Sequence, residues 1–386
     1  MTRLLIVQPY VPSYRLPLFE GMRASLSDVG IQMAVAAGMP QGEVGLRMDS
    51  ATDSAPDFEL SERRLAFASR SVNVRRLGSA LDAFRPDFVI VEQAIKNLET
   101  YPVLARHLAR RGPRLAMWGQ GRSYSTRQSA IESEIKQWVT RRCDWFFAYT
   151  EGGAEYVKSH GFDSSRVTVL NNTIDTVQLS AELAAVTDQD LGTFLVRLGL
   201  TAGRVGLFLG GVDQHKGIDF LLESAVLIEQ ALPGFVLLIG GSGAQGDRVQ
   251  RLEARGGPVR YLGRIDGHDK ALALKAADVL LIPEWVGLVA VDSLVAGRPI
   301  ITTEHPSHSP EFEYLVPDSN CVVTPHEVIV HAQQTAYLLR SRWRINALQE
   351  TALLDSQRFS MDAMVDRFVE GILLWRADYV DRSVQR

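Results

Sequence analysis

The feature that most constrains the fold is an alternation of short apolar runs with segments of helical periodicity along the whole chain. Runs with the length of buried strands lie at residues 4–7, 31–35, 86–91, 114–118, 145–149, 167–170, 205–209, 235–239, 259–262, 279–282 and 299–302. Between them, apolar residues recur at helical spacing, as at Ile218, Leu221, Leu222, Ala225 and Ile228. Strands that alternate with helices connect through right-handed crossovers and form parallel sheets. The sequence therefore predicts an α/β protein.

The alternation begins twice, which predicts two domains. A chain of 386 residues is long for one hydrophobic core and sufficient for two. We expect an N-terminal Rossmann-like domain over residues 1–175 and a second over residues 186–360, each a doubly wound parallel sheet. The polar segment 173–192 is interpreted as the linker, and the Gly-, Asp- and Ser-rich residues 37–60 as a loop.

Composition and charge exclude some classes of partner. Apolar residues make up 46% and charged residues 22% of the chain, as in an ordinary globular protein. The net charge is −4, and residues 1–170 carry 22 Lys and Arg against 18 Asp and Glu, so the rest of the chain is acidic. An acidic half binds nucleic acid poorly, and we therefore expect no nucleic-acid partner. No apolar run has the length that spans a bilayer.

Cysteine usage and basic patches bear on localisation. Cys143 and Cys321 match no metal-binding or Cys-x-x-Cys spacing, and with no signal peptide they favour a reducing cytoplasm. Basic residues gather within residues 63–76 and 106–114. One interpretation is that these are solvated helix faces. The other is peripheral contact of the basic N-terminal domain with anionic lipid at the inner membrane face, where each basic residue adds about 1 kcal/mol.

The most informative local pattern lies at residues 279–292. An apolar run ends at Pro283, Glu284 follows in the exit loop, Gly287 opens a helix, and Asp292 comes eight residues after Glu284. Ligands of open α/β sheets bind at the carboxyl ends of strands, where helix N-termini offer N–H groups to an anion. Carboxylates beside such a site repel phosphate and accept hydrogen bonds from hydroxyls. The pattern predicts a ligand with central phosphates and hydroxyl-rich groups at both ends, which is a sugar nucleotide.

A lysine before the helix at residue 218 supplies a matching cation. Lys216, beside the flexible Gly217, is placed to clamp a diphosphate. The alternative is a solvent-exposed lysine, which the helix dipole disfavours. A glycine turn at residues 240–243 follows another buried strand and permits close backbone approach to a ligand, a signal that is weak alone.

These stretches resemble one known family. Residues 282–303, residues 209–219 and the segment from Asn172 to Asp175 resemble retaining glycosyltransferases of the GT-B fold, family 4 type, or glycosyl transferases group 1. The resemblance is strong over residues 205–315 and loose in the first 150 residues.

The resemblance implies a fold and an activity. It implies two facing Rossmann-like domains, with a C-terminal helix at about residues 361–380 that packs back onto the first. The nucleotide-sugar donor would bind the second domain, and a glycan, lipid-linked or small-molecule acceptor the first. The sugar would be transferred with retention of anomeric configuration, without a metal or other cofactor.

Roles for single residues in the second domain follow from the resemblance. Lys216 would neutralise the leaving diphosphate, Glu284 would face the donor sugar hydroxyls, and Asp292 would accept from the ribose hydroxyls. Further substrate-binding candidates are Gly210, Gly211, Gly241, Arg264, Gly287, Leu288 and Val289.

Candidates in the first domain lie in loops after predicted strands. Gln120 is the catalytic candidate, and Arg122 a substrate-binding one. Arg15, at the start of a helix, is a candidate for contact with an acceptor phosphate or the donor diphosphate. A structural salt bridge explains Arg15 equally well.

The chain departs from the family pattern at four positions. Asp292 stands where the family usually has a glutamate, which keeps the charge but shortens the reach of the side chain by one methylene. Gly211 stands where the family has an arginine, so that Arg248 or Arg264 replaces a missing phosphate-binding cation, or donor binding is altered. Trp285 is expected to narrow the donor-sugar pocket. Gln120 lies near a position where relatives carry a histidine, and an amide cannot act as a general base. We therefore expect a same-face displacement in which the leaving phosphate takes the acceptor proton.

Two histidines and a glutamate raise the alternative of a metal site, and other functions are compatible with the same fold. His305 and His308 lie three residues apart near Glu311, but the intervening prolines break helical geometry and no third strong ligand is evident. We therefore expect no metal, and assign Glu311 to a loop that touches donor or acceptor. The rivals are a sugar-nucleotide epimerase, a phosphorylase, and a non-catalytic nucleotide-sugar-binding subunit.

Overall fold

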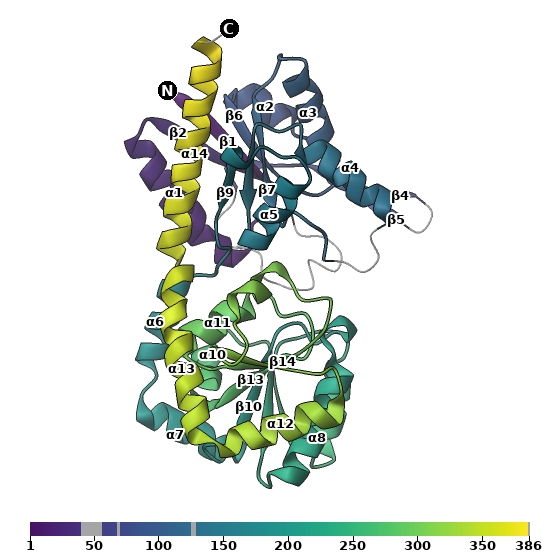
Figure 1. Ribbon diagram of the computed structural model, residues 1–386, viewed down its shortest axis with the longest axis vertical. Coiled ribbons are helices and arrows are strands. Elements are labelled where there is room, and N and C mark those ends of the chain that lie inside the picture. Colours follow the sequence, from purple (N-terminus) through teal and green to yellow (C-terminus); the bar gives the residue numbers. More distant parts are fainter. Residues whose placement is uncertain (40–55, 68–69, 125–128, 385–386) are drawn as a thin grey trace. The chain divides into compact units, whose positions relative to one another are not determined.

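The computed structural model describes residues 1–39, 56–67, 70–124 and 129–384. The chain divides into two compact units, Met1–Asn172 with Met361–Arg386, and Thr173–Ser360 (Figure 1). Each unit contains one parallel sheet with helices on both faces, which confirms the predicted α/β class. Most of the predicted loop 37–60 lies outside the described residues.

The first unit is built on a seven-stranded sheet with the order β3-β2-β1-β6-β7-β8-β9. All neighbouring strands are parallel. The strands are β1 (Thr2–Gln8), β2 (Ile31–Ala37), β3 (Phe58–Glu59), β6 (Phe88–Glu92), β7 (Arg114–Gly119), β8 (Trp145–Ala148) and β9 (Val167–Val169). The helices between them are α1 (Leu16–Asp28), α2 (Gly78–Phe84), α3 (Thr100–Leu108), α4 (Ala130–Thr140) and α5 (Glu151–Ser159). A separate antiparallel hairpin of β4 (Glu62–Phe67) and β5 (Arg70–Arg75) was not predicted.

Both faces of the first sheet are buried, which explains why its strands are almost continuously apolar. Leu4 and Ile6 of β1 belong to the core cluster on one face, and Leu5 and Val7 to the cluster on the other. Successive side chains of a strand point to opposite faces, so a strand covered on both sides needs apolar residues at every position.

The long C-terminal helix α14 (Met361–Val384) belongs to the first unit, where it packs on α1. Phe368 stacks on Phe147 of β8 at a centroid distance of 4.7 Å, and Trp375 meets Phe88 of β6 edge-on at 4.8 Å. Aromatic side chains contribute the largest buried areas of a core. These contacts therefore fix α14 on the sheet, although the whole second unit lies between this helix and the strands of the sheet in sequence.

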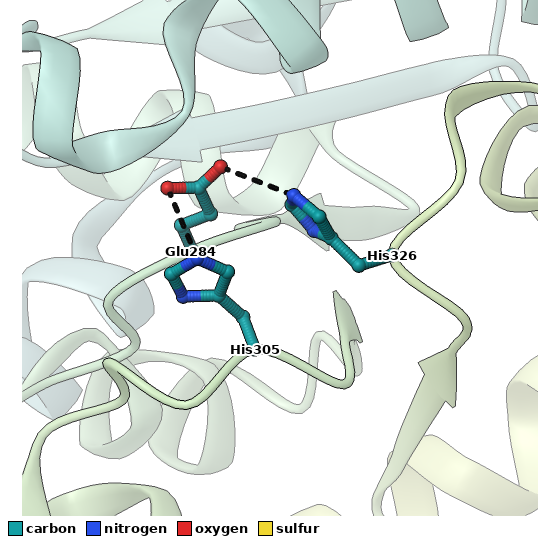
Figure 2. Close-up of side chains that lie close together, drawn as sticks. All are labelled: Glu284, His305 and His326. Carbon is teal, nitrogen blue, oxygen red and sulfur yellow. Dashed lines mark ion pairs between the residues drawn. The ribbon is translucent and has the colours of Figure 1, made fainter.

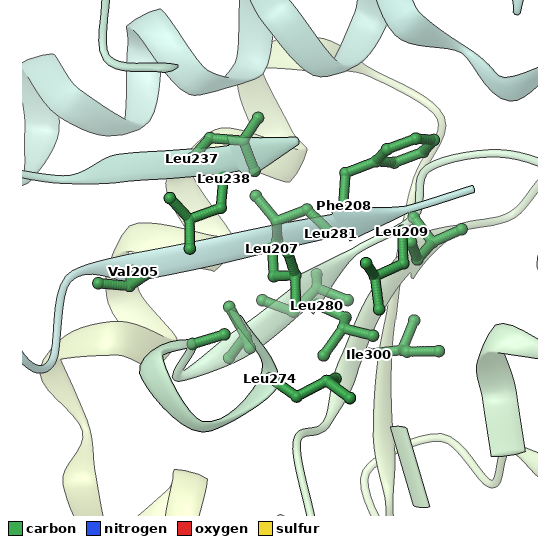
Figure 3. Packing of buried hydrophobic residues seen from close by; sticks show 14 of the residues in the cluster. Val205, Leu207, Phe208, Leu209, Leu237, Leu238, Leu274, Leu280, Leu281 and Ile300 are labelled. Carbon is green, nitrogen blue, oxygen red and sulfur yellow. The ribbon is translucent and has the colours of Figure 1, made fainter. Parts of the chain in front are cut away.

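The second unit is built on a six-stranded parallel sheet with the order β12-β11-β10-β13-β14-β15. The strands are β10 (Val205–Leu209), β11 (Val236–Gly240), β12 (Val259–Gly263), β13 (Val279–Leu281), β14 (Ile300–Thr303) and β15 (Cys321–Thr324). The helices are α6 (Thr176–Ala185), α7 (Asp188–Leu198), α8 (Ile218–Ala231), α9 (Gly246–Ala254), α10 (Gly267–Ala276), α11 (Val289–Ala296), α12 (Val328–Arg340) and α13 (Arg342–Ser356). Leu207, Leu238 and Leu280 at the centre of the core are fully buried (Figure 3).

The interpretation of residues 173–192 as a linker was wrong. This segment forms α6 and the start of α7, and both helices pack against α10. Several of its polar residues are helix caps: Thr187 and Asp190 make a capping box, in which each side chain accepts a hydrogen bond from the other's backbone N–H. Cap residues and linker residues have the same composition, and only the packing distinguishes them.

Candidate functional site

The central loop of the site follows β13 and leads to α11. Glu284 lies in this loop, and the next residue, Trp285, has a left-handed backbone with φ of 52°. A bulky residue adopts this conformation only where its surroundings enforce it, and such residues cluster at functional sites. Two contacts hold the loop: the Trp285 carbonyl accepts a hydrogen bond from Lys216 Nζ at 2.9 Å, and the Val286 N–H donates to His308 Nδ1 at 3.1 Å.

Lys216 and Glu284 lie on loops that touch each other. The first loop follows β10 through a short 3-10 helix, Gln214–Lys216, and Gly217 then starts α8 with φ of 67°. A Cβ atom at Gly217 would lie 2.9 Å from the Glu284 carboxyl carbon. The structure therefore brings together the predicted diphosphate-binding lysine and the predicted sugar-binding carboxylate, although 67 residues separate them in sequence.

Two histidines flank the Glu284 carboxylate. His305 Nε2 lies 3.7 Å from Glu284 Oε2, and His326 Nε2 lies 3.6 Å from Oε1 (Figure 2). The His326 ring is held by Thr303 Oγ1, 2.9 Å from its Nδ1, and by stacking on Phe220 at 4.8 Å. The sequence analysis missed His326. The available signal was its position just after the apolar run of β15, because parallel strands end at a common edge.

His308 has a structural role in this loop region. Its Nδ1 accepts from the Val286 N–H, and its Nε2 lies 2.9 Å from the Thr303 carbonyl oxygen, so both ring nitrogens are used by backbone groups. Burial lowers the pKa of His308, which keeps the ring neutral. Neither nitrogen is available to a metal, which argues against the pair of His305 and His308 as ligands. Glu311 is buried in the 3-10 helix Pro310–Tyr314 that follows.

Asp292 lies in the first turn of α11 and is already paired. Its side chain is 11% exposed, and its Oδ1 lies 2.6 Å from Lys270 Nζ of α10. An acid in the first helical turn also interacts favourably with the helix dipole. A ribose that bound Asp292 would have to share the carboxylate with Lys270, a residue that the sequence analysis did not identify. The three other predicted residues of this segment form the start of the helix: Gly287 accepts from the Ala290 N–H, Leu288 is the N-cap and Val289 the first helical residue.

The glycines of the second unit allow two loops to pack closely. Gly210 and Gly241 have φ of 150° and 146°, and a Cβ at Gly241 would overlap the Gly210 carbonyl oxygen. A Cβ at Gly211 would lie 2.8 Å from Asp213 Oδ2. The sequence predicts that a glycine backbone here approaches a ligand closely. In the structure, the two glycine-containing loops approach each other instead.

The two arginines proposed to replace the missing cation have surface partners. Arg248 Nη1 lies 2.7 Å from Asp219 Oδ1. Asp219 belongs to the first turn of α8, which begins after Gly217. Arg264 Nε lies 3.5 Å from Asp266 Oδ2. Both arginines are substantially exposed, and exposed pairs contribute only about 0–1 kcal/mol, so either side chain can be released to a ligand. The Asp219 contact places Arg248 next to the Lys216 loop.

Arg15 of the first unit is buried, and the groups that contact its guanidinium directly are neutral. Its guanidinium donates to Gln8 Oε1 and, at 2.8 Å, to the Tyr149 hydroxyl, and it lies 4.4 Å above the Trp118 ring. The Glu92 carboxylate raises the pKa of Arg15 from a distance, and no carboxylate of the described residues lies within 4.0 Å of the guanidinium. The structural salt bridge considered from the sequence is therefore wrong, and amide, phenol and indole groups hold this cation instead.

Gln120 and Arg122 follow β7 at the same edge of the first sheet. Gln93 fixes their loop, since its Oε1 accepts from the Gly121 N–H at 2.9 Å and its Nε2 donates to the Gly121 carbonyl at 3.2 Å. The Arg122 guanidinium lies 4.5 Å from the Tyr124 ring, and its carbonyl accepts from Lys136 Nζ at 2.9 Å. Burial lowers the pKa of Lys136 to about 8.

Comparison with known proteins shows what the second unit is similar to. The family model for glycosyl transferases group 1 matches residues 203–341. The chain is similar to the phosphatidyl-myo-inositol mannosyltransferase of Mycobacterium leprae, with 34% identity over 110 residues, which cover 26% of this chain and 29% of that one. The matched part of this chain thus spans less than a third of the length of the mannosyltransferase. It is also similar to the glycogen synthase of Mycobacterium tuberculosis, with 24% identity over 67% of this chain and 64% of that one.

Solved structures extend the likeness to both units as a fold. The structure of Anabaena Alr3699/HepE in complex with UDP has a TM-score of 0.69 and 15% identity, over 96% of this chain and 99% of that chain. The UDP-GlcNAc 2-epimerase from Neisseria meningitidis bound to UDP-GlcNAc has a TM-score of 0.63 and 14% identity, over 97% and 100%. The GT-B fold and the resemblance to glycosyl transferases group 1 are thereby confirmed.

Proposed function

We propose that this protein, whose residues 203–341 match the model for glycosyl transferases group 1, is a glycosyltransferase that moves a sugar from a nucleotide-sugar donor to a hydroxyl acceptor. The observation that carries the proposal is the contact between the Lys216 and Glu284 loops at the carboxyl edge of the second sheet. The donor is a nucleoside diphosphate sugar, and UDP is the first nucleotide to test, because it is named in the complexes of Alr3699/HepE.

The proposed chemistry uses charges that are already in position. The Lys216 ammonium stabilises the charge that develops on the leaving diphosphate, as fixed donors do where charge appears in a transition state. The Glu284 carboxylate accepts hydrogen bonds from the donor sugar hydroxyls. Asp292, with Lys270 beside it, is proposed to accept from the ribose.

The proposed stereochemistry is retention without a metal cofactor. The bond between the anomeric carbon and the diphosphate oxygen breaks while the acceptor oxygen bonds to the same face of that carbon. The acceptor proton passes to the departing phosphate oxygen. Gln120 lacks a basic group, so it serves in this scheme only as a hydrogen-bonding partner.

The acceptor is proposed to be a glycan, a small molecule or a lipid-linked molecule, and one surface feature favours the lipid class. Ile131, Ile135 and Trp138 of α4 are exposed at helical spacing, and Arg142 lies 3.6 Å from the Trp138 ring. An apolar stripe beside basic residues suits the surface of an anionic membrane. None of the described helices is long and apolar enough to cross a membrane.

The test is turnover with and without an acceptor. The protein is incubated with UDP-, GDP- and dTDP-sugars, and nucleotide release and sugar products are measured. A transferase releases nucleotide faster with acceptor and loses this activity in Glu284→Gln, while Glu327→Gln, an exposed acid in the same unit, retains it. Conversion of the donor sugar without acceptor would instead identify an epimerase, and binding without any turnover a non-catalytic subunit.

A further inference from the structure

We propose that Glu284, His305 and His326 form a binding site for a divalent transition-metal ion of the zinc class. Each side chain offers one ligand atom, and these atoms all lie within 4.8 Å of one another. The three residues come from the loops after β13, β14 and β15, and the two imidazole rings approach one carboxylate oxygen each (Figure 2). This set shares only His305 with the His305, His308 and Glu311 combination weighed from the sequence.

The distances suit a shared ion better than direct contact. The two nitrogen-to-oxygen distances, 3.6 and 3.7 Å, exceed those of a hydrogen bond. Ligands arranged tetrahedrally around zinc, each about 2.1 Å from the metal, lie about 3.4 Å apart. Since the three ligand atoms lie within 4.8 Å of one another, their separations need to shorten by no more than about 1.4 Å to reach this spacing.

The hydrogen bonds of His326 point a lone pair at the carboxylate. Thr303 has one hydroxyl hydrogen, which it donates to the Pro283 carbonyl at 2.7 Å. Its oxygen therefore accepts from His326 Nδ1, and the neutral ring carries its hydrogen there. In that neutral form Nε2 faces Glu284 Oε1 with a lone pair on each side, and a cation between the two atoms would satisfy both. Such a bond from the distal nitrogen also orients histidines that bind metals.

His305 has the opposite hydrogen-bonding pattern when no metal is bound. The Ser307 N–H donates to its Nδ1 at a long 3.3 Å, which leaves the ring hydrogen on Nε2, toward Glu284. A metal at Nε2 would displace this hydrogen to Nδ1 and break the Ser307 contact. Binding is therefore expected to change the environment of the 305–308 loop as well as that of Glu284.

The donor set selects the class of metal. Two imidazoles and one carboxylate suit zinc, cobalt and nickel, whereas magnesium and calcium prefer sites made of oxygen alone. Three protein ligands leave a further coordination position open, as in other zinc sites with three protein ligands. A bound metal would occupy the carboxylate assigned to the donor sugar, so metal and donor would compete. This competition rests on the proposed function, whereas the metal site does not.

The site is tested by metal binding without nucleotide. The protein is stripped with a chelator, dialysed and titrated with Co²⁺, whose visible absorption reports its coordination, and Zn²⁺ is then added as competitor. The same titration is made on Glu284→Gln, His305→Ala and His326→Ala, with His268→Ala, an exposed histidine of α10, as the matched control. Circular dichroism establishes that each variant is folded.

We expect one ion per chain, an affinity at least tenfold lower in each of the three variants, and an unchanged affinity in His268→Ala. Absence of binding by the wild type, or binding that survives in all three variants, would overturn the site. Zn²⁺ should also slow sugar-nucleotide turnover by the wild type more than by His326→Ala, each relative to its own metal-free rate. Binding that depends on the three residues supports the site even if no nucleotide sugar is turned over, in which case the proposed function alone fails.

Discussion

The carboxyl edges of the two sheets are built from different kinds of polar group. At the second edge, Lys216 and Glu284 lie on touching loops, and the Glu284 side chain remains 17% exposed. At the first edge, Arg15 is buried and its hydrogen bonds go to Gln8 and Tyr149. Charges that keep some exposure can exchange their partners for a ligand, whereas a buried cation enclosed by neutral groups contributes to rigidity. Among the described residues, the second edge thus keeps partly exposed charges in contact, whereas the cation at the first edge is buried and contacts amide and phenol groups.

Lys216→Ala is expected to have the largest effect, on activity. Loss of the ammonium removes the fixed positive charge beside the leaving diphosphate, and we expect turnover to fall about 100-fold. Steady-state kinetics with the preferred donor measure this, and Lys158→Ala on the first unit is the control. Equal turnover in the two variants would show that the Lys216 ammonium at the second sheet edge does not contribute to catalysis.

Arg15→Met should have its main effect on stability. The change removes the donor of the hydrogen bonds to Gln8 and Tyr149, and we expect the free energy of unfolding to fall by about 2–3 kcal/mol. Thermal or urea unfolding measures the loss, and Arg23→Met, which breaks an exposed pair with Asp57 on the same unit, is the matched control. Unchanged stability together with weaker acceptor binding would instead place Arg15 in a ligand site.

Low pH should destabilise the second unit through His331. Burial lowers the pKa of His331 to about 4, below the ordinary value of 6.5. Between these values the unfolded chain binds a proton that the folded chain does not, so stability is fully present above about pH 6.5 and is lost as the pH falls. We expect a loss of about 2 kcal/mol between pH 7 and 5 that is absent in His331→Gln.

Unfolding measured across this pH range tests the contribution of His331. His268→Gln, on the exposed side of α10, is the matched control. The same pH dependence in wild type and His331→Gln would contradict the prediction. Arg15 keeps its charge throughout this range, so it contributes no equivalent effect in the first unit.

Gly217→Ala should have the smallest effect on stability and an additional effect on activity. Gly217 and Gly199 have nearly equal φ of 67° and 63°, but only a Cβ at Gly217 would meet another group, the Glu284 carboxyl. Each alanine is expected to cost about 1 kcal/mol of stability. Only Gly217→Ala displaces Glu284, and we expect it to lower turnover at least about tenfold. Unfolding and kinetics of both variants measure the two effects, and similar turnover in both would show that the contact does not position Glu284.

Part of the site could be predicted because its information is local. The apolar run before Pro283, the position of Glu284 after it and the Lys216-Gly217 pair before a helix each lie within one strand–loop–helix segment. Since parallel strands end at one edge, knowing the fold class was enough to bring these segments to the same edge. The roles of the residues in catalysis stay predictions.

Other features depend on how separate elements pack. The position of His326 after an apolar run places it at the same edge as Glu284, but the contact between the two side chains depends on packing, as does the pair of Lys270 and Asp292. The neutral surroundings of Arg15 and the packing of α6 and α7 on α10 were missed for the same reason.

The sequence by itself determined the two parallel sheets and the residues at their carboxyl edges, because hydrophobic periodicity and strand-end chemistry act over a few residues. The tertiary structure alone decided which charges are paired, buried or left open to a ligand. Those properties depend on distances between side chains that are remote in the chain, and burial and electrostatic interaction change steeply with such distances.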